Sequence, residues 1–194
     1  VKEGLFKKVT VDAVQGGGGS DNVFITDKLN PYPPQIDIRY HIKELPSNLD
    51  TSGYNSFQSG LSLLVNLEKA DMSNWDLSNV TNFEKCFPNS IKELIFPTIN
   101  NDKITTFSSM CSGCTVLERV DMSNVSTPNL TNTSFMFKQC GALKYLDIRN
   151  MTFDKVTSSS DMFGGGLFGR NPVPADCEII VKSETEKQWI LGIR

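Results

Sequence analysis

The sequence predicts an α/β repeat fold: a short solenoid with a parallel sheet on one face, short helical segments on the other, and a C-terminal strand and helix as a cap. Two observations predict it. A unit of 24 to 26 residues recurs along most of the 194-residue chain. Within each unit, an alternation of apolar and polar residues is followed by apolar residues spaced three and four apart. These are the periods of a strand and of a helical turn, so each unit should contribute one of each.

The repeat is clearest in four units that begin at Leu67, Ile91, Leu117 and Leu143. These residues are 24, 26 and 26 positions apart, and a weaker copy begins at Ile42. Two further apolar positions keep the same spacing in all four units. One position lies 13 residues after the start of each unit and holds Val80, Ile104, Leu130 and Val156. The other is a pair of residues 6 to 7 positions further on, namely Cys86-Phe87, Met110-Cys111, Met136-Phe137 and Met162-Phe163. Such a repeat indicates a stack of similar coils.

The spacing inside a unit predicts its local structure. In the third unit, Val120 and Met122 should lie on one face of a short strand and Asp121 on the other. Later in the first unit, Val80 and Phe83 have the spacing of one helical turn. A unit of about 25 residues cannot bury its own apolar side, so neighbouring units must stack and share a continuous core.

The chain outside the repeats divides by composition. Prolines prevent a helix ahead of the first unit, and a run of four glycines and a serine is typical of a flexible linker, natural or introduced. The predicted parts are residues 1–15, a strand-like segment and candidate fusion peptide; 16–20, the Gly-Ser linker; 21–41, an extended proline-rich lead-in; 42–166, the solenoid; and 167–194, the C-terminal cap.

The C-terminal part has the residues that a cap needs. Ser183 and Glu186 have the spacing of a helix capping box, with Ser183 directly before the helix. Trp189 and Ile190 would then cover the apolar side chains and the strand edge at the open end of the solenoid. The glycines within 164–169 should let the last coil change direction, because no helix start follows them as a phosphate-binding loop requires.

Composition narrows the classes of function. The net charge of −3 and the pI of about 5.2 disfavour a nucleic-acid partner. No apolar run is long enough to span a bilayer, so we expect no membrane insertion. With one histidine and no evident set of nucleophile, base and acid, we expect no enzyme, no metal and no cofactor. The sequence begins at Val1 without a leader, which indicates a processed product or a fragment.

The five cysteines are an odd number, so at least one should be a free thiol. Cys111 and Cys114 form a C-x-x-C pair, the spacing of a redox motif or half a zinc site. Cys111, however, occupies a position that holds phenylalanine in other units, which favours a buried small hydrophobe. Cys114 and Cys140 share a position in consecutive units, so stacking could bring them within disulfide distance under oxidising conditions.

Two stretches resemble a known family. Residues 67–82 read LEKADMSNWDLSNVTN and residues 136–143 read MFKQCGAL. Both resemble the unit of BspA-like leucine-rich-repeat surface proteins, and the similarity extends over about residues 66–166. The resemblance implies a leucine-rich-repeat solenoid and an extracellular protein of the bacterial cell surface that takes part in adhesion. Related units in tail proteins of phages that infect Gram-positive hosts make a virion tail the alternative location.

The candidate binding site lies on the outward positions of the predicted strands. Stacked strands place these residues in rows, where they can meet a partner together. Arg119 and Tyr145 are the strongest candidates, since arginine and aromatic side chains dominate interface hot spots. The expected ligand-binding residues are Lys69, Asp71, Glu93, Arg119, Asp121, Tyr145, Asp147 and Arg149.

The leading functional hypothesis is a non-enzymatic extracellular recognition or adhesion module that binds a protein or glycan on a cell surface. One alternative is a phage tail or baseplate component, structural or receptor-binding, whose N-terminal strand docks to another subunit. A remote alternative is a glycan hydrolase that uses Asp121 and Asp147, which belong to neighbouring predicted strands. The same mixed face is also compatible with an ordinary solvated surface.

Overall fold

The computed structural model describes residues 6–9, 23–25, 42–45, 47, 51 and 54–193, with the side chains of 6–9, 23–25 and 168 excluded. The strands are β1 Phe6–Val9, β2 Val23–Ile25, β3 Glu44–Leu45, β4 Lys69–Asp71, β5 Glu93–Ile95, β6 Ile99–Asn100, β7 Arg119–Asp121, β8 Val125–Ser126, β9 Tyr145–Asp147 and β10 Glu178–Ile180. Among the described residues, the helices are a 3-10 helix, η2 Leu167–Gly169, and one α-helix, α1 Glu184–Ile193.

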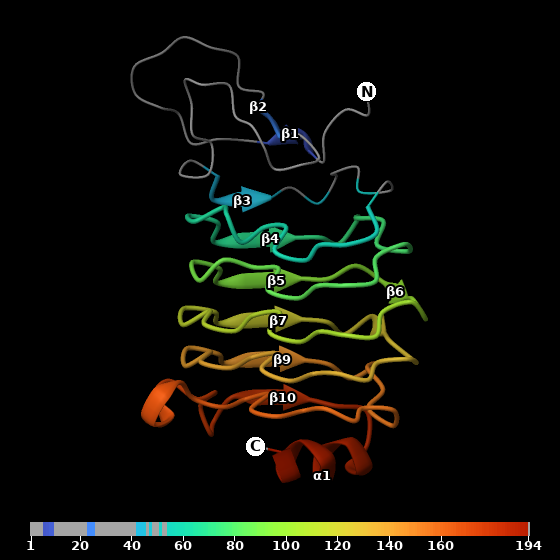
Figure 1. Cartoon of the computed structure of the whole chain (residues 1–194), viewed down its shortest axis with the longest axis vertical. Helices are drawn as coiled ribbons and strands as arrows, with labels where there is room; N and C mark the ends of the chain where they lie inside the picture. The colour runs from blue at the N-terminus through green and yellow to red at the C-terminus, as the bar shows by residue number, and fades with distance from the viewer. Residues whose placement is uncertain are drawn as a thin grey trace.

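Six strands form one parallel sheet along the molecule (Figure 1). Their order is β10-β9-β7-β5-β4-β3, so each coil places its strand beside that of the preceding coil. The register is in step: Glu93 lies opposite Lys69 on one side and opposite Arg119 on the other. The predicted solenoid with a parallel sheet is therefore confirmed, and the outward residues of successive strands form straight rows.

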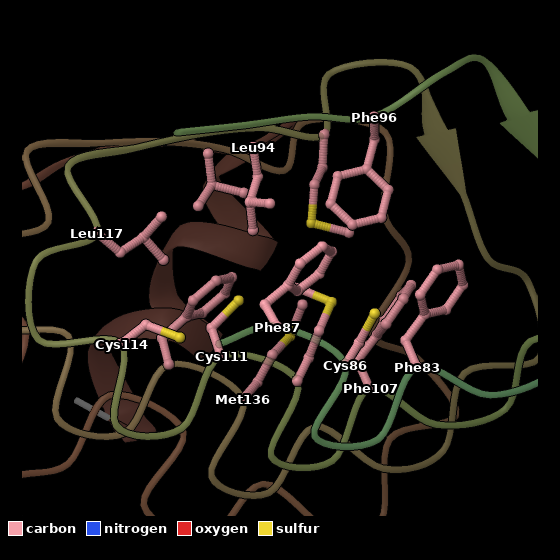
Figure 2. Close-up of a cluster of buried hydrophobic side chains, with 14 of the residues drawn as sticks. Phe83, Cys86, Phe87, Leu94, Phe96, Phe107, Cys111, Cys114, Leu117 and Met136 are labelled. Carbon is pink, nitrogen blue, oxygen red and sulfur yellow. The ribbon is translucent and has the colours of Figure 1, made fainter. Parts of the chain in front are cut away.

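The core runs the length of the solenoid between the sheet and the opposite side of the coils. Figure 2 shows one part of it. The strands contribute small and branched side chains, and the opposite side contributes rings and sulfur atoms such as Phe83, Phe107 and Cys111. Like residues stack from coil to coil, with the Phe83 and Phe107 ring centroids 5.5 Å apart. The repeated apolar positions are buried as predicted, except that Val156 is only partly buried.

The side opposite the sheet consists of turns where short helices were predicted, so that part of the prediction is wrong. Alternate backbone N–H groups donate to carbonyls of the next coil, as from Phe107 to Asn132 (3.0 Å) and from Ser109 to Ser134 (2.9 Å). Because each N–H is used in this way, it cannot also form the hydrogen bond within its own segment that a helix requires. An equivalent residue in each coil also has a positive φ, which ends any helical turn there, and Gly113 and Gln139 add a second such residue in two coils. The equivalent residues are Ser59, Lys85, Ser109, Phe135 and Asp161, with φ between 51° and 60°.

A second, shorter ladder joins the coils away from the main sheet. β6 pairs in parallel with β8, and single bridges connect Asn82, Thr106, Asn132 and Ser158 of consecutive coils. Asn101, directly after β6, is buried and donates through Nδ2 to the carbonyls of Leu77 (2.9 Å) and Val80 (2.8 Å) in the preceding coil. Backbone and amide groups therefore hold the stack in register on more than one side.

The C-terminal end is closed by a strand and a helix, as the predicted fold requires. β10 pairs with β9, and α1 lies beyond it at the end of the stack (Figure 1). The Ser183 hydroxyl donates to the Glu186 carboxylate at the start of α1. On the inner side of the helix, Ile190 is buried and Trp189 stacks on Phe153 with ring centroids 4.5 Å apart. These two side chains cover the core of the last coil.

The glycine-rich turn before β10 depends on close backbone contacts. A Cβ atom at Gly165 would lie 2.5 Å from the carbonyl carbon of Gly169. Gly169 itself has a φ of +70°, which favours glycine. The turn closes through a hydrogen bond of 2.7 Å from the Gly166 N–H to the Arg170 carbonyl.

Most of the predicted N-terminal parts lie outside the described residues. This applies to the Gly-Ser linker at 16–20 and to most of the segments 1–15 and 21–41. Within them the structure describes β1 and β2, which pair in an antiparallel manner.

Candidate functional site

The outward residues of the sheet form two rows. Row one holds the first residue of each strand: Glu44, Lys69, Glu93, Arg119, Tyr145 and Glu178. Row two holds the third residue of each strand from β4 onward: Asp71, Ile95, Asp121, Asp147 and Ile180. All eight predicted site residues except Arg149 are in these rows, and Arg149 follows β9 by two positions. The structure therefore brings the predicted residues together on one face.

Row one is held by ion pairs between coils. Lys69 Nζ lies 2.9 Å from the Glu93 carboxylate, and Arg119 Nε lies 3.8 Å from the other side of that carboxylate. The hydrogen bond with Glu93 is the main reason that the pKa of Lys69 is raised, although burial acts in the opposite direction. Since these side chains are 29–40% exposed, each pair contributes at most about 1 kcal/mol to stability, and its main effect is to fix side-chain orientation.

Five residues of β7, β9 and the turn after β9 form one contact network, here called the β7–β9 cluster. The Arg119 guanidinium lies over the Tyr145 ring, 3.9 Å from its centroid, and Nη2 is 3.2 Å from Asp121 Oδ2. The Tyr145 hydroxyl donates to Asp147 Oδ2 (3.1 Å). Arg149 Nε donates to both oxygens of Asp147, at 2.9 and 3.1 Å. The two arginines, the tyrosine and the two acids are thus fixed relative to one another.

Asp147 is the buried centre of this cluster. Its side chain is 1% exposed, whereas that of Arg149 is 49% exposed. Burial alone would raise the pKa of Asp147, but hydrogen bonds from the Arg149 side chain and backbone and from Tyr145 outweigh it and lower the pKa. The same hydrogen bonds and the charge of Asp147 raise the pKa of Arg149. The carboxylate is therefore ionised at neutral pH and compensated within the protein.

The recurring aspartates also have a local role that the sequence analysis missed. Asp71 Oδ1 accepts from the backbone N–H of Ser73 (3.1 Å), and Asp121 Oδ1 accepts from that of Ser123 (3.1 Å). Asp147 accepts likewise from the N–H two residues on, at 3.2 Å. Each aspartate closes the turn at the end of its strand. The Asp-Met-Ser spacing of two units was the available signal.

A third row of charges, directly before the strands, was also missed. Lys92 Nζ lies 2.7 Å from the carboxylate of Glu68, and Lys144 Nζ lies 2.8 Å from that of Glu118. The hydrogen bond from Lys144 is the main reason that the pKa of Glu118 is lowered. The signal in the sequence was the inverted order of acid and base, Glu-Lys in one unit and Lys-Glu in the next.

The cysteines belong to the core and not to this face. All five are free thiols, so the disulfide considered for Cys114 and Cys140 is not formed. Cys114 Sγ donates to the Pro88 carbonyl (3.4 Å) and Cys140 Sγ to the Cys111 carbonyl (3.2 Å). Burial raises the pKa of Cys111 and Cys140 well above the usual range. In the part of the chain that the structure describes, no group of three or more His, Cys, Asp or Glu is placed to hold a metal ion.

Fold and face together define a class: a parallel β-solenoid built from short repeats, with a polar sheet face whose charges are paired between coils. The chain belongs to the family described as "Mycoplasma protein of unknown function, DUF285", whose model matches residues 48–171. No curated protein and no solved structure matches it significantly. Among the described residues, no helix has both the length and the apolar character needed to cross a membrane.

Proposed function

We propose that this protein is a non-enzymatic extracellular recognition or adhesion module of the BspA-like leucine-rich-repeat type. It binds a protein or glycan on a cell surface through the sheet face. The observation that carries the proposal is the β7–β9 cluster, in which Arg119 and Tyr145 are fixed at the surface by their neighbours.

The cluster supports recognition because its side chains are already ordered. Binding normally costs free energy to immobilise long side chains, about 0.5–1.5 kcal/mol each. Contacts with Glu93, Asp121 and the Tyr145 ring already hold the Arg119 side chain. A partner that contacts this face therefore meets an arginine and a tyrosine whose ordering cost is small, and these are residue types that dominate hot spots.

The surroundings of the acids favour binding over glycan hydrolysis. A hydrolase of this kind needs one carboxyl group with a raised pKa to act as a general acid. Asp147 has the opposite environment, because Arg149 and Tyr145 hold its carboxylate in the ionised form. Asp121 is paired with Arg119 and also closes a backbone turn.

The test is binding of purified protein to intact host cells and to arrays of glycans and matrix proteins. Arg119→Ala and Tyr145→Ala should each weaken binding by about thirtyfold, which corresponds to a typical hot-spot loss of about 2 kcal/mol. The matched control is Lys103→Ala, which removes a lysine paired with Asn79 in another part of the coil. The control should bind like the unmodified protein.

Two outcomes contradict the proposal. If both cluster variants bind normally and deletion of residues 1–15 abolishes association with another subunit, the array is a scaffold, as in a phage tail component. Sustained release of sugar products from cell-wall glycan, abolished by Asp121→Asn, would instead establish a hydrolase.

A further inference from the structure

The charges on the sheet side alternate in sign from coil to coil in two adjacent rows. Residues directly before the strands read Lys43, Glu68, Lys92, Glu118 and Lys144, and the next residues read Glu44, Lys69, Glu93, Arg119 and Tyr145. Coils that begin at Leu67 and Leu117 therefore present acid and then base, and we name them A coils. Coils that begin at Ile42, Ile91 and Leu143 present a base first, and we name them B coils.

The ion pairs between coils in these rows join an A coil to a B coil. Lys92 reaches Glu68 at 2.7 Å, and the equivalent pair in the next two coils, Lys144 with Glu118, has a separation of 2.8 Å. In the neighbouring row, Glu93 of a B coil lies between the bases of two A coils, at 2.9 Å from Lys69 and 3.8 Å from Arg119.

A separate position away from these rows follows the same alternation. Lys103 Nζ of one B coil donates to Asn79 Oδ1 of the preceding A coil (2.9 Å). Lys155 Nζ of the next B coil donates to Asn129 Oδ1 of its preceding A coil (2.6 Å). Lysine stands at this position in the B coils that begin at Ile91 and Leu143, and asparagine stands there in both A coils. Among these four coils, three positions therefore distinguish the two types.

The sequence shows the same two-coil period. The A-coil phrase Leu-Glu, two residues, Asp-Met-Ser-Asn occurs at Leu67 and at Leu117, which are 50 positions apart. The B-coil phrase Ile-Lys-Glu-Leu occurs at Ile42 and Ile91, 49 positions apart. The third B coil, at Leu143, keeps the lysine of this phrase as Lys144 and its second leucine as Leu146.

The residue class at the central strand position does not distinguish A coils from B coils. The central strand residues are buried aliphatic side chains in every coil, namely Leu45, Ala70, Leu94, Val120 and Leu146. The outward charges do distinguish them. Strands about 4.8 Å apart place these charges directly opposite one another, and like charges in that position destabilise the stack. We infer that the alternating rows fix which coil stacks on which, and that the structural unit of the array is a pair of coils, A with B.

The test exchanges acid and base within a coil, which leaves the composition and net charge unchanged. Lys92→Glu with Glu93→Lys turns one internal B coil into an A coil and creates two mismatched interfaces. A second variant adds the same exchange at residues 43 and 44 (Lys43→Glu, Glu44→Lys) and at residues 68 and 69 (Glu68→Lys, Lys69→Glu). It has six substitutions but only one mismatched interface, between the coils that begin at Ile91 and Leu117.

The expected order of stability follows mismatches and not the number of substitutions. Each mismatched interface should lower the melting midpoint by about 2–4 °C. The two-substitution variant should therefore melt below the six-substitution variant, and 1 M salt should reduce the difference because it screens charges beyond about 3 Å. The exchange at residues 43 and 44 alone, with one mismatch at the end of the array, gives a third value if the internal variant fails to fold.

Two results would overturn the inference. One is a midpoint that falls in step with the number of substitutions. The other is a two-substitution variant as stable as the unmodified protein at low salt. The inference does not depend on the proposed function, because melting is measured without any ligand.

Discussion

Replacement of Phe137 by alanine tests the inward register of the coils most directly. Phe137 is fully buried, and its ring stacks on Phe163 with centroids 6.1 Å apart and planes 9° from parallel. Large-to-small changes of this kind cost about 3–5 kcal/mol, with the higher values at sites that cannot collapse around the cavity.

The surrounding backbone places this site in the upper half of that range. The Phe137 N–H donates to the Met162 carbonyl at 2.8 Å, and the Met136 carbonyl accepts from Cys111 of the preceding coil at 2.9 Å. These bonds hold the coils on both sides at their spacing, so neither can move inward to fill the space. Loss of the ring stack adds about 0.5–1.5 kcal/mol to the loss of buried area. We therefore expect about 4–5 kcal/mol.

Urea unfolding at equal m values measures this cost, with Lys138→Ala as the neighbouring control. Lys138 pairs with Asp161 at 2.8 Å and lies 4.7 Å from the Phe135 ring centroid. Loss of these partly exposed contacts should cost about 1 kcal/mol or less. Equal and small costs for the two variants would refute the inward assignment of Phe137 and with it the repeat register.

Two other predictions concern titratable groups. Burial raises the pKa of the Cys86 and Cys140 thiols, so they should react slowly with a thiol reagent in the native protein and rapidly in urea; fast native reaction would contradict their burial. Hydrogen bonds from Arg149 and Tyr145 outweigh burial and lower the pKa of Asp147, so its stabilisation is complete above about pH 4 and is lost as the pH falls through the lower folded-state pKa. The Asp147→Asn variant should therefore be less stable than the unmodified protein at neutral pH but lose less stability as the pH is lowered. Thermal melts of the two proteins over a range of pH measure this, and an identical response to acid would exclude a stabilising role for the Asp147 carboxylate.

The buried positions could be predicted because the apolar residues repeat at fixed intervals. Leu117, Met122 and Cys140 were assigned to the core from spacing alone, and all three are fully buried. A repeat fixes the register of every coil once one coil is assigned, so an error in one unit would have shown as a conflict in the others.

The turns opposite the sheet could not be distinguished from helices in the same way. A single turn and a helix both place residues three apart on one side. The Met110 N–H, for example, donates to the Phe107 carbonyl at 3.1 Å. The difference lies in bonds to the next coil, such as Cys111 to Met136 (2.9 Å), which link residues far apart in sequence. Propensity within one unit contains no information about those partners.

The candidate site was predicted as a set of positions but not as a network. The predicted rows made Arg119 and Tyr145 neighbours on adjacent strands, as the structure has them. The position of the Arg119 guanidinium over the Tyr145 ring depends on side-chain geometry, which the rows do not specify. The contacts of Asp147 with Arg149 and with its own turn are local, and they were overlooked because the acids were considered only as a row across strands.

The same residues serve stacking and the proposed binding, and this limits how a partner can bind. Lys69, Glu93 and Arg119 neutralise one another between coils, so a partner that displaced these pairs would also remove contacts that hold neighbouring coils in register. A partner gains free energy only if it adds contacts above the rows and leaves the pairs intact. Such a surface attracts charged molecules weakly at a distance, because opposite charges alternate within a Debye length. Recognition on this face must therefore depend on shape and on short-range contacts with the ordered arginine and tyrosine, in keeping with a rigid repeat array.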